Sequence, residues 1–129
     1  MNKIYIETSV GELVDKITIL EIKKEKVSDQ KNLEMIDKEY ASLKDSVKKN
    51  LKINDEIKDL WKQLKEVNLK LWEVEDGKRL SEKNKKFDEK FIELARNVYK
   101  YNDLRAKIKS KINQLSGSSI KEVKQYTKY

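Results

Sequence analysis

The chain has 129 residues, of which 41% are charged, and its formal net charge is +7. It contains no cysteine and no histidine. This excludes disulfides, thiol nucleophiles, histidine general bases and the zinc and iron–sulfur sites that these residues build. Proline is absent as well, and a highly charged composition with helical periodicity is typical of solvent-facing helices. The length suits a single domain over residues 1–129, with residues 118–129 as a tail.

The sequence also bears on the location of the protein. No run of about 18 apolar residues is present, so we expect no membrane-spanning helix. The first residues, MNKIYIETSVGEL, lack the apolar core and small-residue cleavage site of a signal peptide. We therefore expect a cytoplasmic protein with no membrane partner.

The start of the chain predicts a short strand and then a buried helix. Residues 3–7 (KIYIE) alternate and are rich in β-prone side chains, which favours a strand. Ser9 and Glu12 have the spacing of a capping box, which predicts a helix over residues 10–27. Apolar residues cover most of the circumference of this helix, as expected for a helix in the centre of a bundle.

Three further helices are predicted, over residues 31–49, 55–86 and 88–115. Each has a stripe of apolar residues at helical spacing. Gly77 interrupts the second of these, which indicates a kink or the close approach of another backbone. Gly117 is placed to end the last one.

Long helices with short connections favour antiparallel neighbours. The expected fold is therefore all-α, an antiparallel helical bundle of about four helices. The VKQYT segment of the tail is compatible with a strand. It either pairs with the strand at residues 3–7, or the tail over residues 118–129 is flexible.

Arginine is the first feature that points to a site. The chain has 27 lysines but only three arginines, Arg79, Arg96 and Arg105. In a lysine-rich chain, an arginine indicates a position that needs a planar, permanently charged fork. Arg105 falls within the apolar stripe of the last helix, where a buried guanidinium needs a carboxylate, a carbonyl or an anionic ligand as its partner.

Polar and aromatic residues, including carboxylates that suit Arg105 as partners, recur on three of the predicted helices. The candidates are Asp15 and Lys16 on the first helix; Trp72, Glu75, Asp76 and Arg79 on the third; and Arg96, Tyr99, Asp103 and Arg105 on the fourth. One interpretation is a pocket for a small anion, clamped by Arg and Lys, with an aromatic ring as a wall. The other, which we favour, is a set of interhelical ion pairs that fix how the helices pack.

Two E-x-x-D pairs, Glu12–Asp15 and Glu73–Asp76, raise the question of a metal. Carboxylates on facing helices can hold Mg²⁺, and helical pyrophosphohydrolases of the MazG type use acidic pairs that these loosely resemble. Such pairs also arise by chance in a chain with 23 acidic residues. We therefore predict no cofactor and no metal site, with Mg²⁺ as the alternative.

Three segments in order, Gly11–Asp29, Lys70–Asp76 and Phe87–Asn113, resemble a family of short bacterial and phage proteins of unknown function. Their sequences, GELVDKITILEIKKEKVSD, KLWEVED and FDEKFIELARNVYKYNDLRAKIKSKIN, are distinctive in combination. The resemblance covers most of the chain and implies an all-helical domain. It supplies no established activity, cofactor or catalytic residue.

Three functions remain open on the sequence alone. The first is a non-enzymatic interaction module that self-associates or binds a protein partner. The alternative is a ligand-binding or enzymatic domain that places Arg79, Arg96 and Arg105 around an anionic metabolite, such as a nucleotide or nucleotide sugar. The third is weak nucleic-acid binding by residues 91–129, which hold nine basic and three acidic residues. Because no recognised nucleic-acid motif is present, we do not expect this third partner.

Overall fold

The computed structural model describes residues 2–120 and 122–129. Four helices account for the regular structure there: α1 (Val10–Lys26), α2 (Gln30–Asn50), α3 (Asp55–Asn84) and α4 (Glu89–Ser116). The prediction of an all-α fold with four helices is confirmed, and the predicted ends agree with these bounds to within two residues. The largest difference is at the end of α3, where Lys85 adopts a left-handed conformation with φ 54° and stops the helix.

Each helix begins at a side chain that caps it. Ser9, Asp29, Asn54 and Asp88 each accept a hydrogen bond from the backbone N–H three residues further on. These bonds satisfy N–H groups that have no partner within the helix. At the other end of α4, Gly117 has a φ of 68°, which glycine adopts without steric cost. The capping role of Ser9 and the position of Gly117 are as the sequence predicts.

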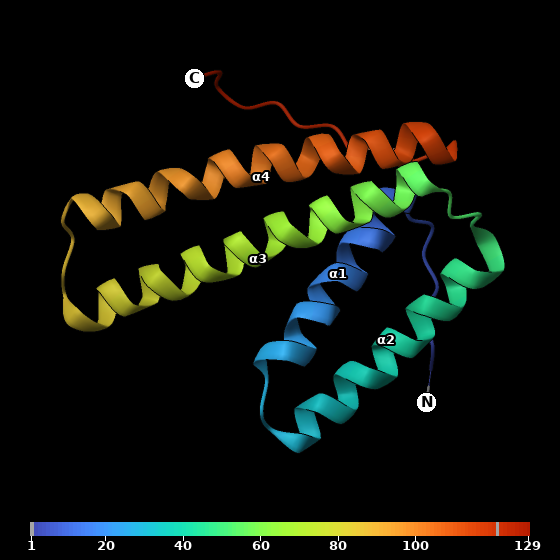
Figure 1. Cartoon of the computed structure of the whole chain (residues 1–129), viewed down its shortest axis with the longest axis horizontal. Coiled ribbons are helices and arrows are strands. Elements are labelled where there is room, and N and C mark those ends of the chain that lie inside the picture. Colours follow the sequence, from blue (N-terminus) through green and yellow to red (C-terminus); the bar gives the residue numbers. More distant parts are fainter. Residues whose placement is uncertain (1, 121) are drawn as a thin grey trace.

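The helices form two antiparallel hairpins of unequal length. Figure 1 shows α3 and α4 as a long hairpin, with the shorter α1–α2 hairpin set obliquely against one half of it. Helix α1 packs against all three other helices, which explains why its apolar residues cover most of its circumference. The bundle is therefore several helices thick at one end and only two helices thick at the other.

The core lies where α1, α3 and α4 meet. Its buried side chains are Val14, Leu60, Leu64, Val67, Ile108 and Ile112. Beyond Val74 the buried core ends, because no side chain between residues 75 and 107 is buried. We call the outer part of the α3–α4 hairpin, residues 75–104, the arm. It extends past α1 and α2 (Figure 1).

The prediction of a strand over residues 3–7 is wrong. Neither these residues nor 122–129 belong to a strand or a helix, and Ile4, Tyr5 and Ile6 are 88%, 84% and 81% exposed. An alternating pattern gives a strand only if another strand supplies backbone partners and a surface to cover. Here the tail follows α4 instead (Figure 1). Within the described residues, no helix combines the length and apolar character needed to cross a bilayer.

Candidate functional site

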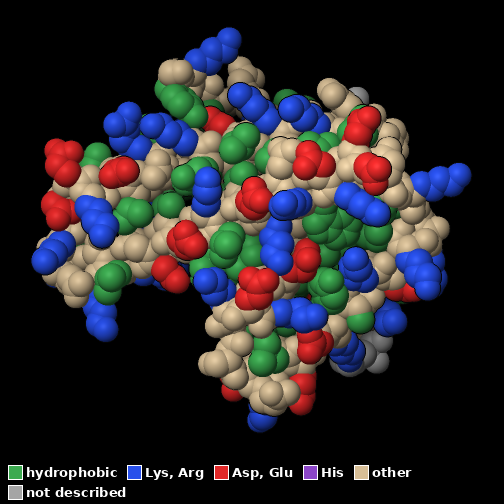
Figure 2. Space-filling view, in the orientation of Figure 1, with side chains coloured by type: hydrophobic (Ala, Val, Ile, Leu, Met, Phe, Trp, Pro, Cys, Tyr) green, Lys and Arg blue, Asp and Glu red, His purple; other side chains and the backbone are tan. Residues whose placement is uncertain are grey.

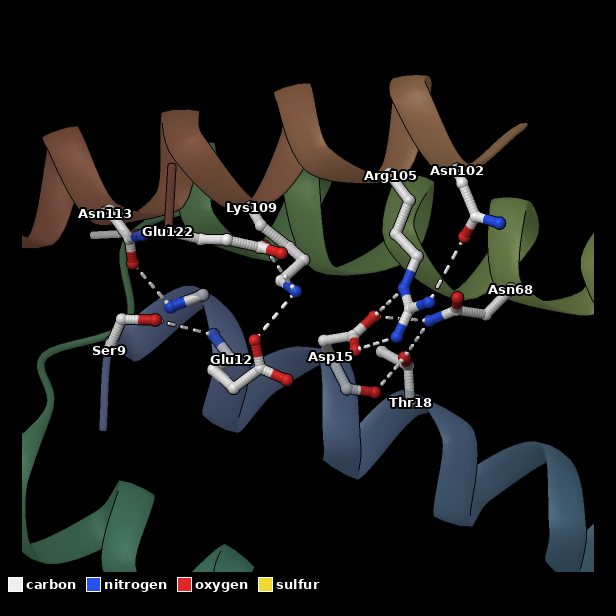
Figure 3. Close-up of polar contacts among 11 residues, drawn as sticks. Ser9, Glu12, Asp15, Thr18, Asn68, Asn102, Arg105, Lys109, Asn113 and Glu122 are labelled. Carbon is white, nitrogen blue, oxygen red and sulfur yellow. Dashed lines mark hydrogen bonds and ion pairs between the residues drawn. The ribbon is translucent and has the colours of Figure 1, made fainter. Parts of the chain in front are cut away.

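Asp15 is the centre of a hydrogen-bonded cluster between α1, α3 and α4 (Figure 3). Its carboxylate accepts bonds from Nε of Arg105 at 2.8 Å, from Nη2 of Arg105, and from Nδ2 of Asn68 at 2.9 Å. Asn68 also donates to the hydroxyl oxygen of Thr18, and that hydroxyl donates to the Asp15 carbonyl. Within the described part of the chain, no buried side-chain nitrogen or oxygen lacks a partner.

The Asp15–Arg105 pair joins residues 90 positions apart in the sequence. The Asp15 side chain is 2% exposed and the Arg105 side chain 27%. The pKa of Arg105 is raised above its ordinary value, because its hydrogen bonds to Asp15 favour the charged form more than burial disfavours it. The pair links α1 to α4 and so sets the position of α4 along α1.

A second set of polar contacts continues along the same side of α4. Lys109 lies 2.7 Å from a Glu12 oxygen and 3.1 Å from a Glu122 oxygen. Asn113 accepts a hydrogen bond from the Gly11 N–H at 2.7 Å. Burial lowers the pKa of Lys109, but its hydrogen bonds to Glu12 and Glu122, together with the negative charges of Asp15 and Glu12, leave the pKa raised overall. The sequence interpretation missed Lys109 and Asn113, although they follow Arg105 at successive intervals of four residues, which places all three on one face of a helix.

Glu12 and Asp15, the acidic pair of α1, both form ion pairs with basic side chains of α4. Glu12 contacts Lys109, and Asp15 contacts Arg105. The carboxylate of Glu12 is therefore directed toward α4, where it forms an ion pair. In the part of the chain that the structure describes, no three acidic side chains gather in a way that could hold a metal ion.

A groove of about 350 Å³ adjoins the cluster, in the angle between α1 and the arm. We refer to it as the groove. Its lining residues are Ile19 and Ile22 from α1; Asn68, Leu71, Trp72, Glu75, Asp76 and Arg79 from α3; and Arg105 from α4. Figure 2 shows the recessed angle between the arm and the α1–α2 hairpin. The groove thus brings together Trp72, Glu75, Asp76, Arg79 and Arg105 of the predicted site, with Asp15 behind them.

Lys16 does not belong to this group. It is 3.1 Å from Glu39 of α2, and its side chain is 58% exposed. Adjacent residues of a helix point about 100° apart, so a buried Asp15 facing α4 directs Lys16 toward α2.

Arg96, Tyr99 and Asp103 lie on the outer face of α4, where Arg96 donates a hydrogen bond to the Tyr99 hydroxyl and the tail contacts Tyr99 and Asp103. The Tyr99 ring stacks on Tyr129 with centroids 4.8 Å apart, and the Tyr129 hydroxyl donates to Asp103 at 2.6 Å. This hydrogen bond raises the pKa of Tyr129. Arg96 lies nine positions before Arg105, which is two and a half turns at 100° per residue, so the two side chains leave α4 on opposite sides. The predicted cluster is therefore divided between two opposite faces of α4.

These features define a class of protein: an all-helical domain with a polar cluster enclosed by three of its four helices. The chain belongs to a family of unknown function, DUF6165, whose model matches residues 4–129. Comparisons with curated proteins and with solved structures gave no match.

Proposed function

We propose that the protein is a cytoplasmic, non-enzymatic interaction module that self-associates through the arm. The observation that carries this proposal is the absence of buried side chains in residues 75–104. Large apolar side chains of the arm are instead exposed. They are Leu80 (57%), Phe87 (54%), Ile92 (49%) and Leu104 (44%).

A pair of helices buries little apolar surface, and most helical stability comes from packing an amphipathic face against other elements. A second arm packed on the first completes a four-helix bundle from two hairpins. Two identical arms can meet in this way about a two-fold axis. The arm holds eight basic and seven acidic residues, so two copies do not repel each other strongly.

The double substitution Leu80→Glu with Ile92→Glu tests this proposal. Both side chains are about half exposed, so we expect the helix content to remain while the dimer dissociates into monomers. Light scattering across roughly two orders of magnitude in concentration measures the change in mass. The matched control is Met35→Glu, because Met35 on α2 is 71% exposed and lies outside the arm. A wild-type protein that stays monomeric at the highest concentration would exclude self-association.

A second candidate function, binding of a small anionic metabolite, rests on the unused donors of Arg105. Its Nε and Nη2 donate to Asp15 and its Nη1 to Asn102, which uses three of the five N–H groups of an arginine. Arg105 lines the groove together with Arg79 and Trp72. The carboxylate of Asp76 also lines the groove and repels a ligand that carries many negative charges. A nucleotide or nucleotide sugar that stacks on Trp72 fits this arrangement best.

A thermal-shift screen against nucleotides and nucleotide sugars, with and without Mg²⁺, tests this second candidate. A ligand at about 100 times its Kd adds about 2.7 kcal/mol to the free energy of unfolding, which raises Tm by several degrees. Arg79→Met should remove the shift, whereas Arg96→Met, on the opposite face of α4, should retain it. If no compound in the panel raises Tm, the groove has no ligand of this class.

A further inference from the structure

The tail and α4 enclose an open cleft on the outer face of α4. Its volume is about 1180 Å³, and its walls come from residues 98–107 of α4 and 124–129 of the tail. In Figure 1 the tail turns back after α4 and runs beside it. Contacts at the two ends hold it there. Glu122 contacts Lys109, and Tyr129 contacts Tyr99 and Asp103. We call this space the α4–tail cleft.

The α4–tail cleft is strongly cationic. Four lysines line it: Lys100, Lys107, Lys124 and Lys128. Asp103 has the one acidic side chain among the described lining residues, and it accepts a hydrogen bond from the Tyr129 hydroxyl. Within the described chain, none of the four lysines has an acidic side chain within ion-pair distance. Their charge is therefore available to an anion, whereas Asp15 offsets the charge of Arg105.

The spacing of the lysines indicates an anion with more than one charged group. Lys100 and Lys107 lie seven residues apart on α4, which is about 10 Å along the helix axis. One phosphate group cannot contact both side chains where they leave the helix, whereas successive phosphates of a chain can. Lys124 and Lys128 extend the same charge along the tail on the other wall.

Exposed tyrosine rings alternate with these lysines. Tyr126 is 77% exposed, Tyr129 75% and Tyr99 39%. Tyr99 and Tyr129 are already parallel, with 5° between their planes. Exposed aromatic faces beside lysines are the means by which proteins bind nucleic-acid strands without sequence preference, because every base has a face that can stack. A duplex keeps its bases stacked inside and cannot offer them in this way.

We propose that the α4–tail cleft binds single-stranded nucleic acid, with phosphates on its lysines and bases on its tyrosines. The α4 wall of the cleft shares residues 98–104 with the arm, but Leu80 and Ile92, whose substitution tests self-association, do not line the cleft. The proposal also assigns four of the nine basic residues between 91 and 129 to one site, where their side chains lie beside exposed tyrosine rings.

Fluorescence anisotropy of the full-length chain with a labelled oligothymidylate of about twelve nucleotides tests the proposal. We expect saturable binding that weakens with salt, with a slope of log affinity against log salt of about −3 for four lysine contacts. A duplex of equal length and vesicles of anionic lipid serve as competitors. Neither should displace the strand at equal phosphate concentration. Displacement by either would overturn the proposal, as would the absence of binding at low salt.

Two sets of variants distinguish binding in the α4–tail cleft from general attraction of the strand by the positive charge of the protein. Lys100→Glu with Lys107→Glu should weaken binding at least about tenfold. The matched control is Lys31→Glu with Lys38→Glu, which has the same charge change and seven-residue spacing on exposed positions of α2. Equal weakening by both pairs would contradict the proposal. Tyr126→Ala should also weaken binding, while Tyr126→Phe should preserve it because the phenyl ring still stacks. If Tyr126→Ala binds as wild type, the stacking role of Tyr126 is excluded.

Discussion

Replacing Asp15 by alanine should lower the free energy of unfolding by about 3–5 kcal/mol. The substitution leaves the Arg105 guanidinium without its carboxylate, and the Asn68 amide loses one of its two acceptors. A charge that is largely removed from water and has no partner is more costly than the pair itself is stabilising. Urea denaturation followed by circular dichroism measures the change.

A double substitution and an exposed aspartate provide the controls. Asp15→Leu combined with Arg105→Met removes both charges, so it should recover most of the stability that Asp15→Ala loses. Asp37→Ala removes a carboxylate that is 60% exposed and pairs with Lys24, and should cost no more than about 1 kcal/mol. If Asp15→Ala costs as little as Asp37→Ala, water solvates Arg105 in place of Asp15 and the cluster does not hold the helices together.

Gly11→Ala should destabilise the protein by about 1–3 kcal/mol. A Cβ at this position would lie 2.6 Å from the Lys109 carbonyl oxygen and 2.9 Å from Oδ1 of Asn113. The first of these is backbone, so α1 and α4 would have to separate. That movement would also lengthen the hydrogen bond from the Gly11 N–H to Asn113, which is 2.7 Å long. Thermal and urea denaturation measure the loss.

Gly77→Ala is the matched control, since Gly77 also lies inside a helix. Its added Cβ would lie 3.1 Å from a methyl carbon of Leu94, and that side chain can move by a small rotation. Alanine favours a helix over glycine by about 1 kcal/mol, so this variant should be neutral or more stable. Similar losses at both positions would show that the close contact of α1 with α4 at Gly11 has no special role.

The sequence predicted the helices well because their signals are local. Ser9 and Gly117 stand at helix ends that side-chain and backbone chemistry specify within a few residues. Arg105 was also informative, because a guanidinium in an apolar stripe requires a partner, and Asp15 is a buried carboxylate on a neighbouring helix. Such inferences need only the period of the helix and the chemistry of a buried charge.

Other features depend on which faces meet in space, and the sequence does not specify this. Arg96 and Asp103 do share a face of α4, but that face lies toward the tail and away from α1. The alternation of residues 3–7 resembles a strand, yet no other strand is present among the described residues to pair with it. The arm has the same apolar periodicity as the rest of α3 and α4, so its lack of cover from α1 and α2 could not be predicted.

The most direct test of self-association through the arm is amide hydrogen exchange as a function of protein concentration. If two arms pack together, amides of residues 75–104 should exchange more slowly as the concentration rises, because local opening of the arm then requires dissociation. Amides of α2, outside the interface, should exchange at an unchanged rate. Exchange in the arm that is independent of concentration would contradict self-association through it.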